Sequence, residues 1–591
     1  MKQYMADFET TTNPEDCRVW AYAICDIDDP DEVIIGTRLD DFLDWCSEQK
    51  GSPRIFFHNL RFDLSFVIDR LFKLGFKHTT EPEDRQTKTF NTMISDKGAV
   101  YQCEIIFYRK GKNVRKVTLR DSLKLIPLPV KAIPKAFGLE EAKGSIDYTL
   151  HNQLPEGSPI SDEEQDYIKK DVQIVAKALK FMFDEGFTKM TIGACALENY
   201  KHTIGKRTFE RWYPTPEYHN DVKKSYRGGF TYLNPEFASK IVSKGQTYDV
   251  NSLYPSVMRS HDNPLPFGTP IFFQGKYQPN PIYPLYTQMF SCQFEIKKNK
   301  IPTIQIKHSL SFVGNEYLTS SHGEEVVLCL NSVDMELFFQ QYDVYNITYH
   351  SGWMFKASVG MFDQYIDYWT EQKIKAGKEG NKGKRTIAKL CLNSLYGKFG
   401  QDTQNINKVP YMGEDGSVHY YLSDPKPKKG LYIAVASFIT SYARRVTITS
   451  AQRIEDDYHS GKSKNRFVYA DTDSLHVYSP DDEIPEGLDI DPYRLGAWKL
   501  ESKFSDYGQK KGYGAKYLRQ KCYIENLTED VDNPNATDYS LKITVAGMPD
   551  TCYDQVTFDN FYIGATYFGK KMPKVVDGGT VLIDGTFTIK K

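Results

Sequence analysis

The hexapeptide YADTDS, at Tyr469–Ser474, constrains the fold of this chain more than any other stretch. Alternating apolar and polar residues flank it at Arg466–Tyr469 and Ser474–Tyr478, which predicts two β-strands joined by a tight hairpin. Asp471 and Asp473 then lie together at the tip, where two like charges are costly unless a cation neutralises them. Hard carboxylate ligands favour a pair of Mg²⁺ ions, with Mn²⁺ as a substitute. Taken alone, such a motif is more often a solvated acidic turn, so the rest of the chain must decide.

Length and composition set broad limits. At 591 residues the chain should form several domains, and its 40% hydrophobic and 26% charged residues are typical of a soluble globular protein. No apolar run approaches the ~20 residues that span a membrane, and the N-terminus has no signal-peptide core, so we expect no membrane partner. The ten scattered cysteines lack CxxC and zinc spacings, which indicates reduced thiols of a cytoplasmic protein. The net charge of −2 does not exclude nucleic acid, because metal-binding acids offset a basic groove.

The first third of the chain carries acids that are able to converge. Asp7 and Glu9 have period-2 spacing in the strand-like stretch QYMADFETTT, so both side chains leave the same face of that strand. A strand at Ile55–Phe57 and a polar turn follow, and then a helix that we expect to carry Asn59 and Asp63. Each pair by itself is ordinary surface chemistry.

A second helix adds a further acid. SDEE at Ser161–Glu164 fits a capping box, so a helix begins there and places Tyr167 and Asp171 on one face. Four acids from a strand and two helices suit two metal ions, and a tyrosine that orients water completes a phosphodiester-hydrolysing site. Lys143, in a preceding loop, is a candidate to steady the scissile phosphate, although a lone loop lysine is more often only solvated.

A second unit begins after about residue 190. Glycines let the backbone of SYRGGF, at Ser225–Phe230, approach a ligand, and its Tyr and Arg suit base and phosphate; a tight turn is the alternative. QTYDV predicts a buried strand that places Asp249 at its end, and Tyr254 projects from the turn that follows. A bulky ring beside the metal stacks under an incoming sugar and clashes with a 2′-hydroxyl, which selects deoxyribose.

The stretch after residue 362 predicts two helices joined by a basic, glycine-rich turn. Arg385, Lys389 and Asn393 form one stripe along the second helix, at i, i+4 and i+8, and Tyr396 lies close to it. A cationic stripe is most often a solvated face. Together with Lys373 from the first helix, this stripe is suited to binding a triphosphate.

The remaining segments are less specific. Residues 262–362 show short strand-like runs that indicate an inserted domain, and 401–431 predict a projecting hairpin with a GEDG turn and a basic tail. AKYLRQKCYI places Lys521 and Tyr523 on one predicted strand face, as a clamp on a nucleic-acid backbone. The C-terminus predicts strands separated by DGG and DG turns.

Read in order, the motifs are D-x-E, N-x-x-x-D, Y-x-x-x-D, Y-x-G-G, D-x-x-S-L-Y-P, K-x-x-x-N-S-x-Y-G, Y-x-D-T-D and K-x-Y. This series resembles the family B DNA polymerases, and most of all the protein-primed replicative polymerases of small tailed bacteriophages, the phi29 type. The resemblance covers essentially the whole chain with every motif in order. Two departures are visible: Arg385 stands where a Lys is common, and GQKKGYG at Gly508–Gly514 resembles a small extra loop.

The resemblance implies an α/β multidomain (α+β) fold, in which a ribonuclease-H-like 3′–5′ exonuclease domain precedes a right-hand polymerase with two inserted subdomains. The implied domains are the exonuclease (1–189), palm (190–261 and 432–544), first insertion (262–362), fingers (363–400), second insertion (401–431) and thumb (545–591).

The resemblance also implies residue roles. The exonuclease carboxylates and metal ligands are Asp7, Glu9, Asp63 and Asp171, assisted by Tyr167 and Lys143. The palm's catalytic and metal positions are Asp249, Asp471, Asp473 and the Val250 carbonyl, with Asp473 the bridging ligand and Asp471 in support. The dNTP positions are Tyr254, Lys373, Arg385, Lys389, Asn393 and Tyr396. The DNA positions are Thr10, His58, Asn59, Phe62, Ser122, Leu123, Tyr226, Arg227, Gly228, Gly229, Ser252, Gly397, Lys521 and Tyr523.

These roles imply a processive, strand-displacing, protein-primed DNA polymerase with a proofreading exonuclease, each site using two Mg²⁺ ions. The implied partners are DNA template and primer, dNTPs and a terminal priming protein, for a monomer in the cytoplasm of an infected bacterial host. The alternative is a 3′–5′ exonuclease with a non-catalytic DNA- or terminal-protein-binding module, which would lack at least one palm acid. All three are present.

Overall fold

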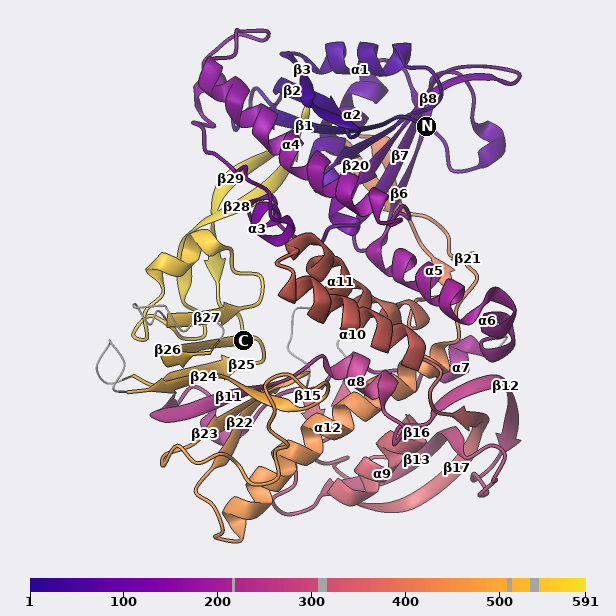
Figure 1. The fold of residues 1–591 in the computed structure, drawn as a ribbon, viewed down its shortest axis with the longest axis vertical. Coiled ribbons are helices and arrows are strands. Elements are labelled where there is room, and N and C mark those ends of the chain that lie inside the picture. The colour runs from indigo at the N-terminus through magenta and orange to yellow at the C-terminus, as the bar shows by residue number, and fades with distance from the viewer. Residues whose placement is uncertain (215–217, 307–315, 507–512, 532–540) are drawn as a thin grey trace.

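The computed structural model describes residues 1–214, 218–306, 316–506, 513–531 and 541–591. Figure 1 shows one sheet domain at the top, built from the N-terminal part of the chain, and the rest of the chain below it. Most of the predicted loop Gly508–Gly514 lies outside the described residues. Within them, no helix combines the length and the apolar character needed to cross a membrane.

The N-terminal domain is an eight-stranded sheet in the order β3-β2-β1-β4-β8-β7-β6-β5. Its strands are β1 (Gln3–Thr10), β2 (Val19–Asp26), β3 (Asp29–Gly36), β4 (Arg54–Phe57), β5 (Lys77–His78), β6 (Thr89–Ile94), β7 (Val100–Lys110) and β8 (Asn113–Asp121). Its helices are α1 (Leu39–Glu48), α2 (Leu60–Lys73), α3 (Ile133–Phe137) and α4 (Asp162–Asp184).

Successive side chains of β1 point to opposite faces of the sheet, which builds two cores. Tyr4, Ala6 and Phe8 pack with α1 and α2, whereas Met5 belongs to the core that α4 covers. The capping box predicted at the start of α4 is present: the Ser161 hydroxyl accepts from the Glu164 backbone N–H, and the Glu164 carboxylate accepts from the Ser161 N–H. The α/β character predicted for this segment is therefore confirmed.

The lower body is built on a nine-stranded sheet in the order β10-β25-β26-β24-β11-β23-β22-β9, with β27 paired to β26. Its strands are β9 (Thr231–Leu233), β10 (Ile241–Val242), β11 (Lys244–Val250), β22 (Arg466–Asp471), β23 (Ser474–Tyr478), β24 (Trp498–Ser505), β25 (Ala515–Arg519), β26 (Cys522–Asp530) and β27 (Leu541–Val545). Helices α5 (Ile192–Ile204), α6 (Lys206–Trp212), α7 (His219–Lys223) and α8 (Leu253–Arg259) precede or interrupt these strands, and the long α12 (Ile433–His459) packs against β22.

The predicted inserted domain is a four-stranded antiparallel sheet in the order β12-β17-β13-β16. Its elements are β12 (Leu265–Gln274), β13 (Leu285–Ile296), β14 (Ile304–Ile306), β15 (Glu316–Leu318), β16 (Val326–Asn331), α9 (Ser332–Gln341) and β17 (Tyr342–Ser358). The two predicted helices after it are α10 (Asp363–Lys378) and α11 (Lys382–Phe399), which pack on each other.

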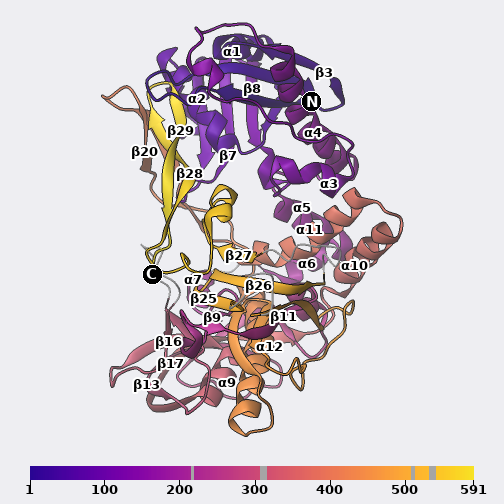
Figure 2. The same ribbon diagram turned by 90° about the vertical axis from the view of Figure 1, so that its left-hand side faces the viewer.

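Two hairpins extend from this body toward the N-terminal domain. The first consists of β19 (Lys408–Met412) and β20 (Val418–Leu422), above a short pair of β18 (Gln404–Asn405) and β21 (Lys426–Pro427). The second consists of β28 (Thr566–Val576) and β29 (Gly579–Thr588) near the C-terminus. Figure 2 shows β28 and β29 rising beside β20 to the N-terminal domain, where β29 contacts α2.

Two local expectations are wrong. Asn59 lies just before α2, at φ 75°, and not on that helix. Lys521 and Tyr523 do not share a strand face, because β25 ends at Arg519 and Lys521 sits in the turn before β26 with φ 53°. The Tyr523 side chain is buried in the sheet core, so only Lys521 is exposed for a ligand.

Candidate active sites

The first site is an acid cluster on the N-terminal sheet. Carboxylate oxygens of Asp7, Glu9 and Asp171 all lie within 4.8 Å of one another, although Asp171 comes from α4 on the far side of a long loop. Asp63, from α2, is close enough to Asp7 for the Asp7 charge to raise the pKa of Asp63. One oxygen of Asp63 and one of Asp171 are buried and have no protein partner. Unpartnered carboxylate oxygens are suitable ligands for hard divalent cations.

The charges in this cluster are unfavourable without a cation. Burial, and then the charge of Asp171, raise the pKa of Asp7 to about 7. Burial raises the pKa values of Glu9 and Asp63 well above their ordinary range, with Asp7 adding to each. Four acids that repel each other in a desolvated site fit a divalent-cation site, since the cation would restore the ionised form.

Lys143 and Tyr167 stand beside these acids, as predicted. The Lys143 Nζ donates to Asp171 Oδ2 over 2.5 Å and lies 5.4 Å from the Tyr167 ring centre. The hydroxyl of Tyr167 bonds that of Tyr148, 2.7 Å away. Tyr148 was missed by the sequence analysis; its signal is its place in the same GSIDY segment that follows Lys143. Tyr148 is 43% exposed, whereas Tyr167 is buried.

Several positions expected to grip single-stranded DNA lie at or just beyond the ends of β1, β4 and β8 of the same sheet. His58 Nδ1 is 3.0 Å from the Ser122 hydroxyl, which itself donates to the Phe57 carbonyl, so these two polar side chains are already engaged within the protein. Thr10 is buried, and Leu123 is partly exposed.

Asp121 holds two of these positions together and was not predicted. One of its oxygens accepts from the backbone N–H groups of both Asn59 and Leu123, each over 3.0 Å. The carboxylate is 3% exposed, and Lys124 lies 3.4 Å from its other oxygen. Asp121 therefore fixes the left-handed turn at Asn59 relative to the Leu123 segment, from below the surface that a ligand would touch.

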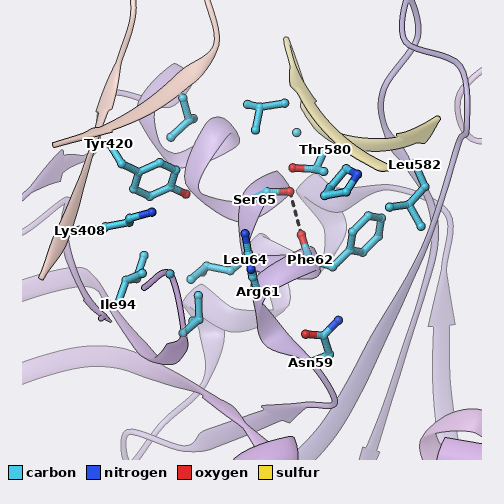
Figure 3. A pocket seen from close by; sticks show the side chains of 16 residues that line it. Asn59, Arg61, Phe62, Leu64, Ser65, Ile94, Lys408, Tyr420, Thr580 and Leu582 are labelled. Atoms are coloured by element: carbon cyan, nitrogen blue, oxygen red, sulfur yellow. Dashed lines mark hydrogen bonds between the residues drawn. The ribbon is translucent and has the colours of Figure 1, made fainter. Parts of the chain in front are cut away.

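A cavity of about 440 Å³ opens where α2, the β19–β20 hairpin and the β28–β29 hairpin meet. Figure 3 shows Asn59 and Phe62 on one side of it, Lys408 and Tyr420 on another, and Leu582 near Phe62. The three elements are distant in sequence, so the cavity exists only in the assembled chain.

The second site is the tip of the β22–β23 hairpin. Asp249 is the second-last residue of β11 and pairs with Ser474, and the Val250 N–H donates to the Asp473 carbonyl over 2.8 Å, so the strand end and the hairpin tip are adjacent. Burial, and then the Asp471 charge, raise the pKa of Asp473. Asp471 is instead paired with Lys521, 2.6 Å away. Among the described residues, the acids that gather into a three-carboxylate group are those of the first site, not these.

The predicted triphosphate-binding cations do converge. Lys373 on α10 has its pKa lowered by burial and then by Arg385 and Lys389 on α11, which places the three cations near one another. Lys499, opposite Asp249 in β24, adds to that effect and was missed by the sequence analysis. Arg385, Lys389 and Asn393 are exposed, as the stripe on α11 predicts.

Aromatic rings line the approach to the second site. The Tyr254 ring stacks on Tyr396, with centres 4.0 Å apart and planes at 23°. A Cβ on Gly397 would meet nothing within 4 Å, so that side is open to a ligand. Ser252, at φ 54°, is the residue just before α8, and Tyr254 is the second residue of that helix.

The segment Tyr226–Gly229 passes over the hairpin tip. A Cβ on Gly229 would lie 2.5 Å from the Thr472 hydroxyl, so only glycine permits this approach. Arg444 of α12 donates to the backbone carbonyls of Arg227 and Gly228, over 2.7 and 2.6 Å, and fixes the segment in place.

Comparison with known proteins identifies this arrangement. A sequence model of the family "DNA polymerase type B, organellar and viral" matches residues 154–485. The DNA polymerase of Bacillus phage M2 is 42% identical over all of both chains, and that of Bacillus phage phi29 is 43% identical over all of this chain and 99% of its own. The chain belongs to the phi29-type family B DNA polymerases. The DNA polymerase of Streptococcus phage Cp-1 is also similar, at 33% identity over 98% of its length.

Solved structures support the same assignment for the fold of this polymerase. Phi29 DNA polymerase complexed with primer-template DNA matches it with a TM-score of 0.90 at 42% identity, over all of both chains. The ternary complex of phi29 polymerase with primer-template DNA and incoming nucleotide substrates matches with a TM-score of 0.89. The predicted fold, an exonuclease domain followed by a right-hand polymerase, is thereby confirmed, and divalent-metal dependence follows from the family.

Proposed function

We propose that this polymerase copies DNA from dNTPs at the Asp249–Asp473 site and removes mispaired primer ends at the Asp7 cluster. The observation that supports both roles is that each acid set is complete and is surrounded by its own cations and aromatic rings. The two sites lie in separate sheets, so one activity is expected to survive loss of the other.

At the polymerase site, Asp249, Asp473 and the Val250 carbonyl would hold two Mg²⁺ ions, with Mn²⁺ as a substitute. When bound, such an ion pair supplies charge at the attacking and leaving oxygens of an in-line displacement. Lys373, Lys389 and Arg385 bind the triphosphate and stabilise the pyrophosphate as it leaves, with Asn393 on the same helix face. Tyr254 lies under the sugar, and Tyr396 supports it.

At the exonuclease site, Asp7, Glu9, Asp63 and Asp171 would hold the metal ions. Lys143 steadies the scissile phosphate, and Tyr167 with Tyr148 orients the attacking water. The frayed strand reaches the acids past the cavity at the three-way junction, which supplies Lys408 for phosphates and Phe62 for a base.

DNA contacts extend between the sites. We assign the primer's passage to Tyr226, Arg227, Gly228 and Gly229, and its clamping to Lys521. We propose that Ser252 and Gly397 lie close to the template and the incoming nucleotide. The residues proposed to hold the single-stranded primer end are Thr10, His58, Asn59, Phe62, Ser122 and Leu123. Tyr523 acts by packing beneath Tyr469 rather than by touching DNA.

The inserts at 262–362 and 401–431 suit priming by a terminal protein, strand displacement and processivity. The domain limits are those expected from the sequence: exonuclease 1–189, palm 190–261 and 432–544, fingers 363–400 and thumb 545–591. The polymerase acts as a monomer in the cytoplasm of an infected bacterium.

One primer-extension assay tests the central proposal. The wild type should lengthen a primer with dNTPs and shorten it without them. Asp473→Ala should abolish lengthening only, and Asp7→Ala with Glu9→Ala should abolish shortening only. If the wild type only shifts the DNA on a gel, both roles are refuted; if it only shortens the primer, the chain is an exonuclease with a binding module.

Protein priming needs its own measurement. The polymerase, a candidate terminal protein and one labelled dNTP at a time should yield a covalent protein–dNMP product with one of the four. If the polymerase is active but no such product forms, the proposal of protein priming is refuted, whereas the proposal of DNA synthesis stands.

A further inference from the structure

A second cavity, of about 560 Å³, lies on the outer side of the lower body. The C-terminal end of α5, helix α6 and the chain segment that leads into α12 form its walls. Gly205, at φ 84°, makes the sharp bend between α5 and α6 that opens the cavity. Neither acid site described above contributes a residue to it.

Cations in this cavity lack acidic partners. No carboxylate of the described residues lies within 4.0 Å of Lys206 or Lys429, and both side chains are exposed. Lys201 rests over the Phe209 ring, 4.8 Å from its centre. The acid Glu198 is already shared between Lys189 and His202, at 3.9 and 3.6 Å. The lining also includes the exposed carboxylate of Glu210, so three lysines face two carboxylates and the cavity keeps a net positive charge.

More cations lie next in sequence to the lining residues. Arg207 and Arg211 on α6 and Lys428 beside Lys429 are all exposed. Burial lowers the pKa of Lys398, and the nearby charge of Lys428 lowers it further. Cations that outnumber the acids around them gain from a bound polyanion.

The lining of the cavity suits phosphate better than bases. Its aromatic floor, Phe209 and Tyr213, is only 6% and 5% exposed, and the Tyr213 hydroxyl is bonded to that of Tyr200 at 2.8 Å. Base stacking needs an exposed ring face, which Phe209 and Tyr213 do not offer, and the exposed ring of His202 is 3.6 Å from the Glu198 carboxylate. Binding here would therefore be independent of sequence and sensitive to salt.

The position of the cavity points to the ligand. It adjoins Lys429–Leu431, at the foot of the β18–β21 pair that carries the β19–β20 hairpin. Figure 1 shows α6 on one side of α10 and α11 and the strands β25–β27 on the other. The primer clamp Lys521 lies in the turn between β25 and β26, so the cavity is on the opposite side of the fingers helices from the primer.

We propose that this cavity binds phosphates of single-stranded DNA ahead of the polymerase site. The proposal rests on the proposed DNA-copying function and adds to it a contact for DNA that has not yet been copied. Two strands carry this chemistry there: the unpaired template and the non-template strand displaced from a downstream duplex.

Equilibrium binding of the full chain tests the proposal. The variant is Lys206→Glu with Lys429→Glu, and the matched control is Lys50→Glu with Lys112→Glu, two exposed lysines of the N-terminal domain. Fluorescence anisotropy in EDTA, which stops excision, would compare three DNAs: a primer-template with a one-nucleotide overhang, one with a 20-nucleotide template overhang, and a fork with a 20-nucleotide displaced strand.

We expect the cavity variant to bind a long-tailed DNA about tenfold more weakly than the control does, and the one-nucleotide DNA equally well. Loss of two phosphate contacts should also reduce the slope of log K against log salt by about 1.4. Weakening on the overhang DNA alone identifies the template, and weakening on the fork alone identifies the displaced strand.

Equal binding of variant and control to all three DNAs would overturn the proposal, as would equal weakening on all three. Lys206→Ala with Lys429→Ala repeats the comparison if charge reversal lowers the melting temperature. Primer extension on the one-nucleotide DNA distinguishes failure of the proposed function from failure of the cavity proposal. If the wild type does not extend this primer, the proposed DNA-copying function is refuted. If it extends the primer normally and the cavity variant binds the long-tailed DNAs as tightly as the control does, only the cavity's role is refuted.

Discussion

Lys521 is bonded to both carboxylate oxygens of Asp471, with its Nζ 2.7 and 2.6 Å from them. The pair joins the tip of the β22–β23 hairpin to the turn before β26. Thr231 and Tyr469 donate to the same carboxylate, over 3.1 and 3.2 Å. Asp471 is therefore engaged by the protein, and we infer that one of its roles is to position Lys521, the residue proposed to clamp the primer.

Asp471→Asn should consequently weaken primer binding more than it slows chemistry. The ion pair is partly exposed, so its loss is expected to cost about 1 kcal/mol, or roughly fivefold in primer affinity. Single-turnover extension at increasing primer-template concentration should show a raised half-saturation point with a maximal rate within about threefold of wild type. Asp473→Asn is the control, and its maximal extension rate should fall to near zero. An equally large fall in the maximal rate of Asp471→Asn would indicate that Asp471 is a metal ligand.

The acid cluster of the exonuclease site predicts a pH-dependent metal effect. Asp7 has a folded pKa of about 7 against an ordinary 3.8, so between those values the folded protein binds more protons than the unfolded chain. Metal-free stability should therefore fall as pH rises from about 4 to 7. Because Mg²⁺ needs ionised ligands, the rise in melting temperature that it causes should be larger at pH 8 than at pH 6.

Differential scanning fluorimetry with and without Mg²⁺ measures this effect. Asp7→Ala with Glu9→Ala should remove most of the difference between the two pH values, whereas Asp249→Ala should leave it. An Mg²⁺ shift in the wild type that is equal at both pH values would contradict the cluster's assigned role.

Asp121→Ala should impair excision without impairing synthesis. The carboxylate holds the backbone of Asn59 and Leu123 and touches no predicted ligand, so its loss should loosen the grip on a frayed strand. We expect KM for single-stranded DNA degradation to rise about tenfold, with kcat changed much less. Lys124→Ala, which removes the 3.4 Å ion pair and the contact with the Tyr101 ring but keeps the Asp121 carboxylate, should behave as wild type. A loss confined to kcat would instead place Asp121 in the chemistry.

Tyr254→Val should let ribonucleotides in. The ring that we propose excludes a 2′-hydroxyl is held by stacking on Tyr396, and valine fills much less of that space. The ratio of kcat/KM for a dNTP over the matching rNTP should drop at least tenfold. Tyr254→Phe keeps the ring and should keep the ratio; unchanged discrimination in Tyr254→Val would end the steric assignment.

Gly578→Ala should undock the tip of the β28–β29 hairpin. A Cβ at Gly578 would lie 2.1 Å from the Cys17 carbonyl, and the residue has φ 95°. Lys73, which pairs with both Asp69 and Asp577, holds the same tip on α2. Hydrogen exchange should rise in α2 and in the hairpin tip. Gly569→Ala, whose Cβ would meet nothing closer than 3.4 Å, is the matched control for the positive φ; equal exchange in both variants would mean that the tip is not anchored there.

The sequence predicted features that depend on interactions between residues close together in the chain. Period-2 alternation predicted the strands around Asp471, the capping box predicted the start of α4 at Asp162, and the basic turn predicted the break between α10 and α11. Each depends on residues within a few positions of one another. The prediction for Lys521 was wrong because the turn before β26 has no local sequence signal. Its two residues include no Gly, Pro or Asn.

The sequence by itself determined the order of the motifs, and with it the family and the identity of the acids. Only the tertiary structure decided which acids meet and what neutralises them. Asp7 and Asp171 are separated by 164 positions yet lie in one cluster, and Lys521 meets Asp471 across 50 positions. Such contacts depend on how whole sheets and helices pack, and short-range patterns carry no record of that packing. The two cavities are of this kind, since each is bounded by segments that only folding brings together.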